Sequence, residues 1–432
     1  MIPPEQWAPW STKRTLPAVP SPDLRGRLGP LLEREYRLFF SATTISTLGD
    51  SVAGIALAFA VLDLTGDPIY LGIIFAARQV ANILLVLYGG VLSDRLPRNR
   101  ILVGASLGQG AAQAATAAVV LSGHASIWVL VALQVLYGAA DGFVIPAETG
   151  LVPQTVSEAR LQQANAMRGL SRNLIFVAGP AIGGVIVVAG SPGIALAIDA
   201  VSFVGAALLL VRIRLPIRAG EVAPTHFFHE LREGWREFTA RTWLWSTVAI
   251  FGLGNVFFMF WPVLGPVVSK EHLGGAGAWA VILSVNGIGA VLGGLVALRY
   301  RPRLPLVACI VWPTLVSVQL AALALHASTW LIATASLLAG LAIAIHLTLW
   351  FTIFQREVPE HAQSRVSSYD ALGSFVLTPL GFVIAGFMAS AIGTSRALWI
   401  AAGAILVLNT SMLLIPSVWR IGRLAPTSMA AS

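Results

Sequence analysis

Long apolar runs alternate with short polar gaps along most of the chain. About 20 apolar residues in a helix cross the roughly 30 Å core of a bilayer, and each run reaches about that length. The runs lie near 38–62, 69–92, 101–121, 126–147, 164–189 and 194–213, and then near 244–268, 276–298, 304–325, 329–354, 367–391 and 396–416. This pattern predicts an all-α membrane protein with 12 transmembrane helices, six before a polar linker and six after it.

The composition agrees with lipid as the main solvent of the chain. Charged residues make up 11% of it and hydrophobic residues 56%, whereas soluble domains carry roughly 25% charged residues. The net charge of +8 suggests nucleic acid at first sight. We expect no nucleic-acid partner, because the arginines lie between apolar segments and not on one polar face.

The positions of Lys and Arg predict the orientation. They gather in alternate gaps, whereas only Lys270 and Arg396 fall in the gaps on the opposite side. Because cytosolic loops carry the excess of Lys and Arg, we expect a multi-pass protein of the inner (plasma) membrane with both termini in the cytosol. The expected parts are a flexible cytosolic tail (1–35), an N-terminal six-helix bundle (36–213), a cytosolic linker (214–243), a C-terminal six-helix bundle (244–418) and a second cytosolic tail (419–432).

The linker contains an amphipathic segment. Phe228, Leu231, Trp235 and Phe238 recur at helical spacing, with charged residues mostly on the other face. Such a segment is typical of a helix that lies flat on a membrane surface, and a site for a regulatory partner is the less favoured alternative.

Sequence features after the second run recur after the eighth. The pair Gly89 and Gly90 aligns with Gly293 and Gly294, roughly 200 residues later. Pro180 in the fifth run likewise corresponds to a proline in the eleventh. The two bundles are therefore expected to be pseudo-symmetric. Parallel halves with a substrate site at their interface near mid-membrane are a known plan of transporters.

At this point the chain resembles the major facilitator superfamily. The loop after the second run reads G-x-x-x-D-R-x-x-R-x-R, formed by Gly90, Asp94, Arg95, Arg98 and Arg100. The segments "STLGDSV", "NAMRGLSRNL" and "AIDAVSFV" are most similar to the branch of macrolide efflux proteins and enterobactin exporters. The resemblance covers about residues 35–418. It implies that the loop is a cytosolic gating loop, in which Asp94 and Arg95 form a latch with the eleventh helix in the outward-facing state.

The fifth run carries "GPAIGG", with Gly179, Pro180, Gly183 and Gly184. It resembles part of a motif of antiporters in the family, in which Pro180 would bend the helix. A plain glycine packing seam explains the same residues equally well.

Ionisable residues inside spans are candidates for function. At 1.5 Å per helical residue, Asp50 and Arg78 both fall in the middle third of the bilayer on adjacent antiparallel helices. We therefore expect them to form a pair. The pair is either purely structural or a proton-coupling site that separates in one state, and Asp141 is the next candidate for coupling. Relatives often carry an arginine in the fourth span where this chain has Gln134, which weakens the case for coupling.

Four polar or aromatic residues of the second half are candidates for a substrate pocket: Asn255, Phe258, Trp261 and Asn286. For any one of these residues taken alone, the alternative is a side chain that faces lipid.

The favoured function is export of a hydrophobic or amphipathic small molecule, such as an antibiotic, drug or siderophore, by proton antiport. The alternatives are an importer or facilitator and a non-transporting sensor or scaffold. We expect no enzyme, because no H-E-x-x-H metal motif and no phosphate-binding G-x-x-x-x-G-K-[ST] motif occurs. We also expect no cofactor, no metal and a monomer whose partners are substrate, protons and lipid.

Overall fold

The computed structural model describes residues 29–215 and 227–422, and within them every main element is helical. The tail predicted at 1–35 therefore lies mostly outside the described residues, as do parts of the linker and of the C-terminal tail. The helices of the first half are α2 (Arg34–Thr65), α3 (Pro68–Arg95), α4 (Arg98–Leu121), α5 (Ile127–Asp141), α6 (Val144–Thr155), α7 (Leu161–Ala189) and α8 (Pro192–Leu210). Those that follow are α9 (Phe227–Thr239), α10 (Thr242–Phe258), α11 (Phe260–Val268), α12 (Ala276–Ala297), α13 (Pro305–Val311), α14 (Leu315–Ala324), α15 (Thr329–Glu357), α16 (Glu360–Phe375), α17 (Thr378–Ile392) and α18 (Thr394–Ser411).

Several predicted spans are two helices in series. α5 with α6, α10 with α11, α13 with α14, and α16 with α17 each continue one another after a short break. Prolines such as Pro313 and Pro379 lie at or beside these breaks. Proline lacks the N–H that a helix interior needs, so it ends or bends the helix there. Pro180, by contrast, lies inside the unbroken α7.

Eleven helices in the described residues are long and apolar enough to cross a membrane. The predicted span that is not among them is α4, which nevertheless packs against α5 and α8. α4 carries Gln109 and Gln113, and both are buried. Their amides lower the hydropathy of the helix while facing the bundle interior. The all-α membrane fold is thus confirmed, whereas the count of 12 spans stays a prediction.

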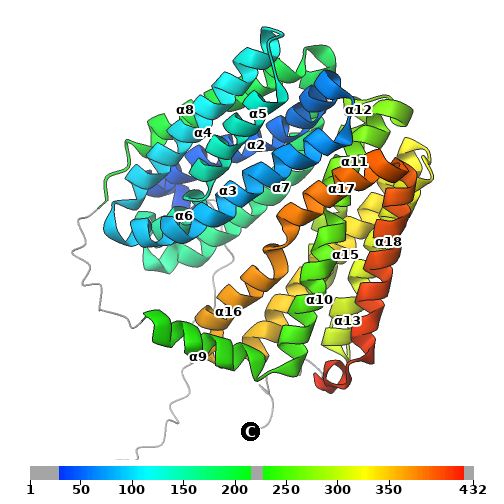
Figure 1. The fold of residues 1–432 in the computed structure, drawn as a ribbon. Coiled ribbons are helices and arrows are strands. Elements are labelled where there is room, and N and C mark those ends of the chain that lie inside the picture. The colour runs from blue at the N-terminus through cyan, green and yellow to red at the C-terminus, as the bar shows by residue number, and fades with distance from the viewer. Residues whose placement is uncertain (1–28, 216–226, 423–432) are drawn as a thin grey trace, which may run out of the picture.

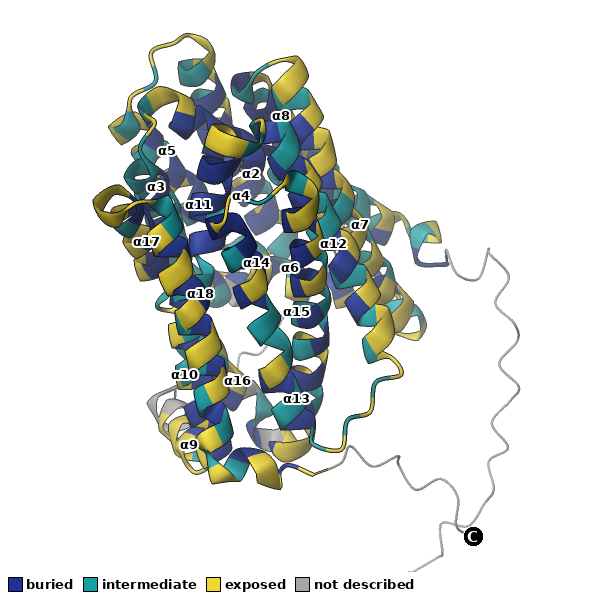
Figure 2. Cartoon of the chain, turned by 90° about the vertical axis from the view of Figure 1, so that its right-hand side faces the viewer, coloured by how far each residue is buried: buried dark blue, intermediate teal, exposed yellow. Residues whose placement is uncertain are grey.

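The outer faces of the helices remain apolar. Val185, Val201 and Trp330 are each about 70% exposed, at 67%, 70% and 73%. Figure 2 shows such exposed residues on the outward sides of helices whose inward sides are buried. Apolar outer faces on long helices are suited to lipid and not to water.

The two bundles contact each other at one end and diverge toward the other (Figure 1). The main contacts join α3 to α17 and α7 to α12. We call the end at which the two bundles meet the closed end. It also carries the ion pair between Lys270 Nζ and Asp63 Oδ1, at 2.5 Å, and the hydrogen bond that Ser390 donates to Asp67. The end that carries α9 and the loop between α3 and α4 is the open end.

The internal repeat is visible in the packing. A Cβ added at Gly89 would lie 2.8 Å from the Gly142 carbonyl oxygen at the end of α5, and one at Gly293 would lie 2.3 Å from the Leu341 carbonyl oxygen in α15. The second span of each half thus approaches the fourth span of that half through an aligned glycine.

The amphipathic linker segment forms α9, as predicted. Its Phe238 is buried, and the Phe238 and Trp235 rings lie 5.9 and 5.5 Å from the Tyr369 ring of α16. The described part of the apolar face therefore packs partly on the second bundle and not only on a membrane surface.

Candidate functional site

An ion pair lies inside the first bundle. The Nη2 atom of Arg78 in α3 is 3.8 Å from Oδ1 of Asp50 in α2, so the expected pair is present. The Tyr137 hydroxyl of α5 donates a hydrogen bond to the same Asp50 oxygen, and the Arg78 guanidinium lies over the Tyr137 ring, 4.0 Å from its centroid. The three side chains form one unit, and whether it couples to protons stays a prediction.

Two further carboxylates are held close by amides. Asp141 accepts hydrogen bonds from Asn82 Nδ2 at 2.8 Å and from Gln109 Nε2 at 3.2 Å. Asp199 is fully buried and accepts one from Gln113 Nε2 at 2.7 Å. Within the described residues, Arg78 forms its ion pair with Asp50, whereas Asp141 and Asp199 are held by amides. Moving or adding one charge in such a surrounding is costly.

Gln134 lies one turn before Gly138 on α5. It is fully buried, and neither of its amide atoms has a hydrogen-bond partner among the described residues. A Cβ at Gly138 would lie 2.1 Å from the Arg78 carbonyl oxygen, so α3 and α5 touch at Arg78. The Arg78 backbone thus contacts the fourth span one turn after Gln134.

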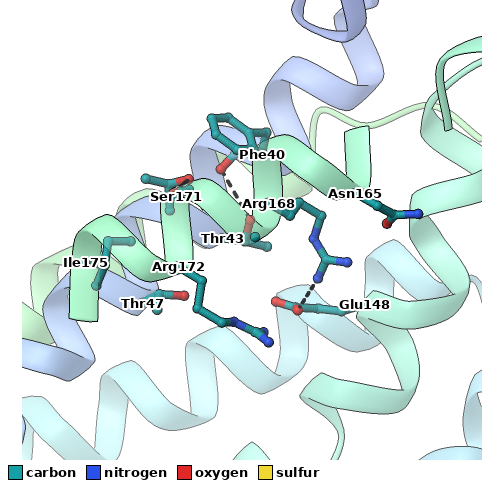
Figure 3. A pocket seen from close by; sticks show the side chains of 11 residues that line it. Phe40, Thr43, Thr47, Glu148, Asn165, Arg168, Ser171, Arg172 and Ile175 are labelled. Carbon is teal, nitrogen blue, oxygen red and sulfur yellow. Dashed lines mark hydrogen bonds and ion pairs between the residues drawn. The ribbon is translucent and has the colours of Figure 1, made fainter. Parts of the chain in front are cut away.

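A polar cavity of about 210 Å³ opens between α2, α6 and α7 (Figure 3). Arg168 Nη2 donates to Glu148 Oε2 at 2.8 Å on its wall, and the Arg172 side chain points into the same space. A smaller cavity of about 50 Å³ shares Thr43, Thr47 and Glu148 with it.

Asp50 and Asp141, which do not line the larger cavity, also line the smaller one. Glu148 therefore lies between the larger cavity and the two intramembrane carboxylates. The sequence pattern missed Glu148 because the apolar run was taken to end one residue earlier, whereas the membrane-spanning segment continues to Thr155. The sequence pattern also missed Tyr137, whose hydroxyl has no signature in a hydropathy pattern.

The predicted gating loop joins α3 to α4 at the open end. Arg98 Nη1 donates to the Gly150 carbonyl of α6 at 2.7 Å, and Arg100 is exposed. Gly90 has open space where a Cβ would be. The side chains of Asp94 and Arg95 lie outside what the structure describes, so the predicted latch stays a prediction.

The glycines of the fifth span contact two different helices. Cβ atoms at Gly179 and Gly183 would meet Ser51 and Val52 of α2, and one at Gly184 would lie 2.2 Å from the Ala280 Cβ of α12. The segment is therefore a packing seam, and its last glycine belongs to the contact between the bundles. A role in antiport stays a prediction.

A larger, mostly apolar pocket of about 320 Å³ lies in the second bundle. Asn255 and Phe258 line it, and Asn255 Nδ2 donates to the Ser374 carbonyl at 2.8 Å. Trp261 instead packs against Trp279 in the buried core, and Asn286 donates to the Ser336 carbonyl of α15. The structure thus brings two of the four pocket candidates together and places the other two elsewhere.

The long apolar helices, with charged residues inside the spans, define a multi-pass membrane protein. A sequence model of the Major Facilitator Superfamily matches residues 39–376, and the chain belongs to this family. It is a transporter and not an enzyme.

Relatives and solved structures agree with the assignment of the chain to this family. Macrolide efflux protein A of Streptococcus pyogenes is 20% identical over 374 residues, which cover 84% of this chain and 91% of that protein. Multidrug efflux pump Tap of Mycobacterium tuberculosis (strain ATCC 25618 / H37Rv) is 24% identical over 373 residues, covering 82% and 87%. A bacterial homolog of the lysosomal transporter Spinster, solved in an inward-facing and unoccupied conformation, has the same fold, with a TM-score of 0.68, 14% identity and coverage of 91% and 99%.

Proposed function

We propose that this chain exports a hydrophobic or amphipathic small molecule across the plasma membrane by proton antiport with alternating access. The observation that carries the proposal is the Asp50–Arg78–Tyr137 unit, which holds an ionisable carboxylate at mid-span beside a polar cavity. The efflux proteins among its relatives support export over import.

The orientation follows from the basic loops. The open end carries Arg98, Arg100 and the helix α9, whereas the closed end carries Lys270. The positive-inside rule then puts the open end in the cytosol. On this assignment the structure corresponds to the inward-facing state, and both termini face the cytosol.

Proton coupling needs Asp50 to be charged in one state and neutral in the other. When Asp50 is ionised, Arg78 compensates its charge and holds α3 against α2. When Asp50 takes up a proton, that attraction is lost and the guanidinium turns toward Asp141 and Asp199. When Arg78 moves from Asp50 to the other two carboxylates, the relative energies of the inward-facing and outward-facing conformations change. Coupling requires such a change.

Protons leave this unit for the cytosol through Glu148. Its carboxylate lines both the larger cavity and the smaller cavity that contains Asp50 and Asp141. A proton that leaves Asp50 in the inward-facing state passes to Glu148 through the smaller cavity and from there to the cytosol.

The gating loop closes the open end in the opposite state. In the inward-facing state α3 ends away from the second bundle, and we infer that Asp94 and Arg95 meet the start of the eleventh span when the bundles rock together. The substrate binds in the pocket lined by Asn255 and Phe258, and the exporter works as a monomer.

Accumulation of a fluorescent dye or a macrolide in expressing cells tests the proposal. Expression should lower accumulation several-fold, and a protonophore should abolish the difference. Equal accumulation with and without the protein, at equal expression in the membrane, would overturn the exporter assignment.

A further inference from the structure

Asp370 is a carboxylate within the apolar pocket of the second bundle. It lies on α16 and lines the pocket together with the rings of Phe251, Phe258 and Trp350. The Phe251 and Trp350 rings meet edge to face, with centroids 5.6 Å apart. A charged group thus faces a space whose walls are mostly aromatic and aliphatic, with Asn255, His346, Ser374 and Asn409 as the other polar side chains.

Neutral donors hold this carboxylate in place. Trp350 Nε1–H donates to Oδ2 at 3.0 Å, and Ser374 Oγ–H donates to Oδ1 at 3.4 Å. Within the described part of the chain, no Arg, Lys or His forms an ion pair with Asp370. His346 also lines the pocket, but its Nδ1 donates to the Cys309 carbonyl at 2.8 Å.

Asp370 differs from Asp50 of the first bundle in its countercharge. There, Arg78 compensates Asp50, so that the protein itself supplies the countercharge. Asp370 is oriented by hydrogen bonds but has no cation from the described residues. Asp370 is half-buried. A carboxylate partly withdrawn from water without a countercharge is costly, and a ligand that brings a positive charge into the pocket recovers part of that cost.

We propose that this pocket selects organic cations. The cationic nitrogen or phosphorus of an amphipathic molecule sits against the Asp370 carboxylate and over the rings of Phe251 and Trp350, where aromatic faces attract positive charge. The apolar body of the molecule fills the rest of the pocket, whose volume of about 320 Å³ suits a small drug-like molecule. This inference rests on the proposed export function, because it names the class of substrate that the exporter takes.

Binding to the purified full-length protein tests the inference. The probes are tetraphenylphosphonium, a permanent cation, and triphenylphosphine oxide, a neutral molecule with similar rings. The wild type should bind the cation at least about tenfold more tightly than the neutral probe. Asp370→Asn keeps the shape and an acceptor for Trp350, so it should remove this preference while binding of the neutral probe stays within about twofold.

The controls separate charge from folding. Glu360→Gln removes an exposed carboxylate from the first turn of the same helix, outside the pocket, and should leave the preference intact. Asp370→Glu should retain part of it. If Asp370→Asn keeps the full preference for the cation, or if the wild type binds both probes equally, the inference is wrong.

The binding measurement needs no proton gradient. Selective binding of the cation together with absent proton-driven export would retain the pocket assignment and reject the proposed antiport. Export driven by protons without any preference for the cation would retain the proposed antiport and reject the pocket assignment.

Discussion

Gly72 of α3 lies directly against Phe382 of α17 at the closed end. A Cβ on Gly72 would be 2.3 Å from the Phe382 carbonyl oxygen, closer than real side chains approach. Because the contact is with backbone, no rotamer change relieves it. The two bundles can close at this end only while residue 72 has no side chain.

Gly72→Leu should therefore separate α3 from α17 and favour the state that is open at this end. We expect about a tenfold shift in the equilibrium, which is about 1.4 kcal/mol. The measurement is the labelling rate of single cysteines placed at the closed end, which should rise about tenfold. Gly205→Leu is the matched control, because a Cβ at Gly205 meets nothing within 4 Å. Equal labelling in both variants would contradict the assigned role of the seam.

Glu148→Gln should slow proton-coupled transport because it removes the carboxylate between the two cavities. We expect at least about a tenfold loss in the rate driven by a pH gradient. Substrate binding should stay within about twofold, which shows that the variant is folded. The rate is measured in proteoliposomes that contain a pH-sensitive dye.

Glu158→Gln serves as the control for this prediction, because Glu158 is an exposed acid close to the open end of α7. Thr47→Leu provides an independent test, since Thr47 lines both cavities and a larger side chain would fill the passage. A full rate in both Glu148→Gln and Thr47→Leu would exclude this route.

The loops at the closed end should respond to acid. The His272 and His326 rings stack with centroids 3.9 Å apart, and partial burial together with His272 lowers the pKa of His326 below its usual 6.5. A lowered pKa means that the separated loops bind more protons than the stacked loops do. Acidification below about pH 6.5 should therefore loosen the stack, and neutral pH should restore it.

Hydrogen exchange of residues 269–275 measures this effect. Exchange should speed up on acidification, after correction for the intrinsic rate, in the wild type but not in His326→Gln. If exchange responds to acid identically in the wild type and in His326→Gln, the histidine pair is not the cause.

Much of the fold could be predicted from the sequence because every segment that crosses the hydrocarbon core must be long, apolar and regular. Long apolar runs become helices wherever lipid surrounds them, and α9 followed from its 3.6-residue periodicity. α4 is the exception among the predicted spans. Gln109 and Gln113 reduce its apolar character because they serve Asp141 and Asp199, and a hydropathy pattern does not show such pairing.

The site was predictable only in part. Depth along two antiparallel helices is enough to pair Asp50 with Arg78, because rise per residue is constant. Pocket residues depend instead on the rotation of each helix and on breaks within spans. Asn255 and Phe258 reach the pocket, whereas Trp261 lies beyond the break between α10 and α11 and packs on Trp279. The docking of α9 on Tyr369 likewise depends on a contact between distant segments.

The central claim is that the carboxylate of Asp50 carries the coupled proton. The most direct measurement is substrate-dependent proton movement in proteoliposomes that contain either the wild type or Asp50→Asn, with binding of the same substrate measured in parallel. We predict that wild-type vesicles move protons in the direction opposite to the substrate, and that Asp50→Asn binds substrate but moves no protons. Proton movement by Asp50→Asn at the wild-type rate would contradict the claim.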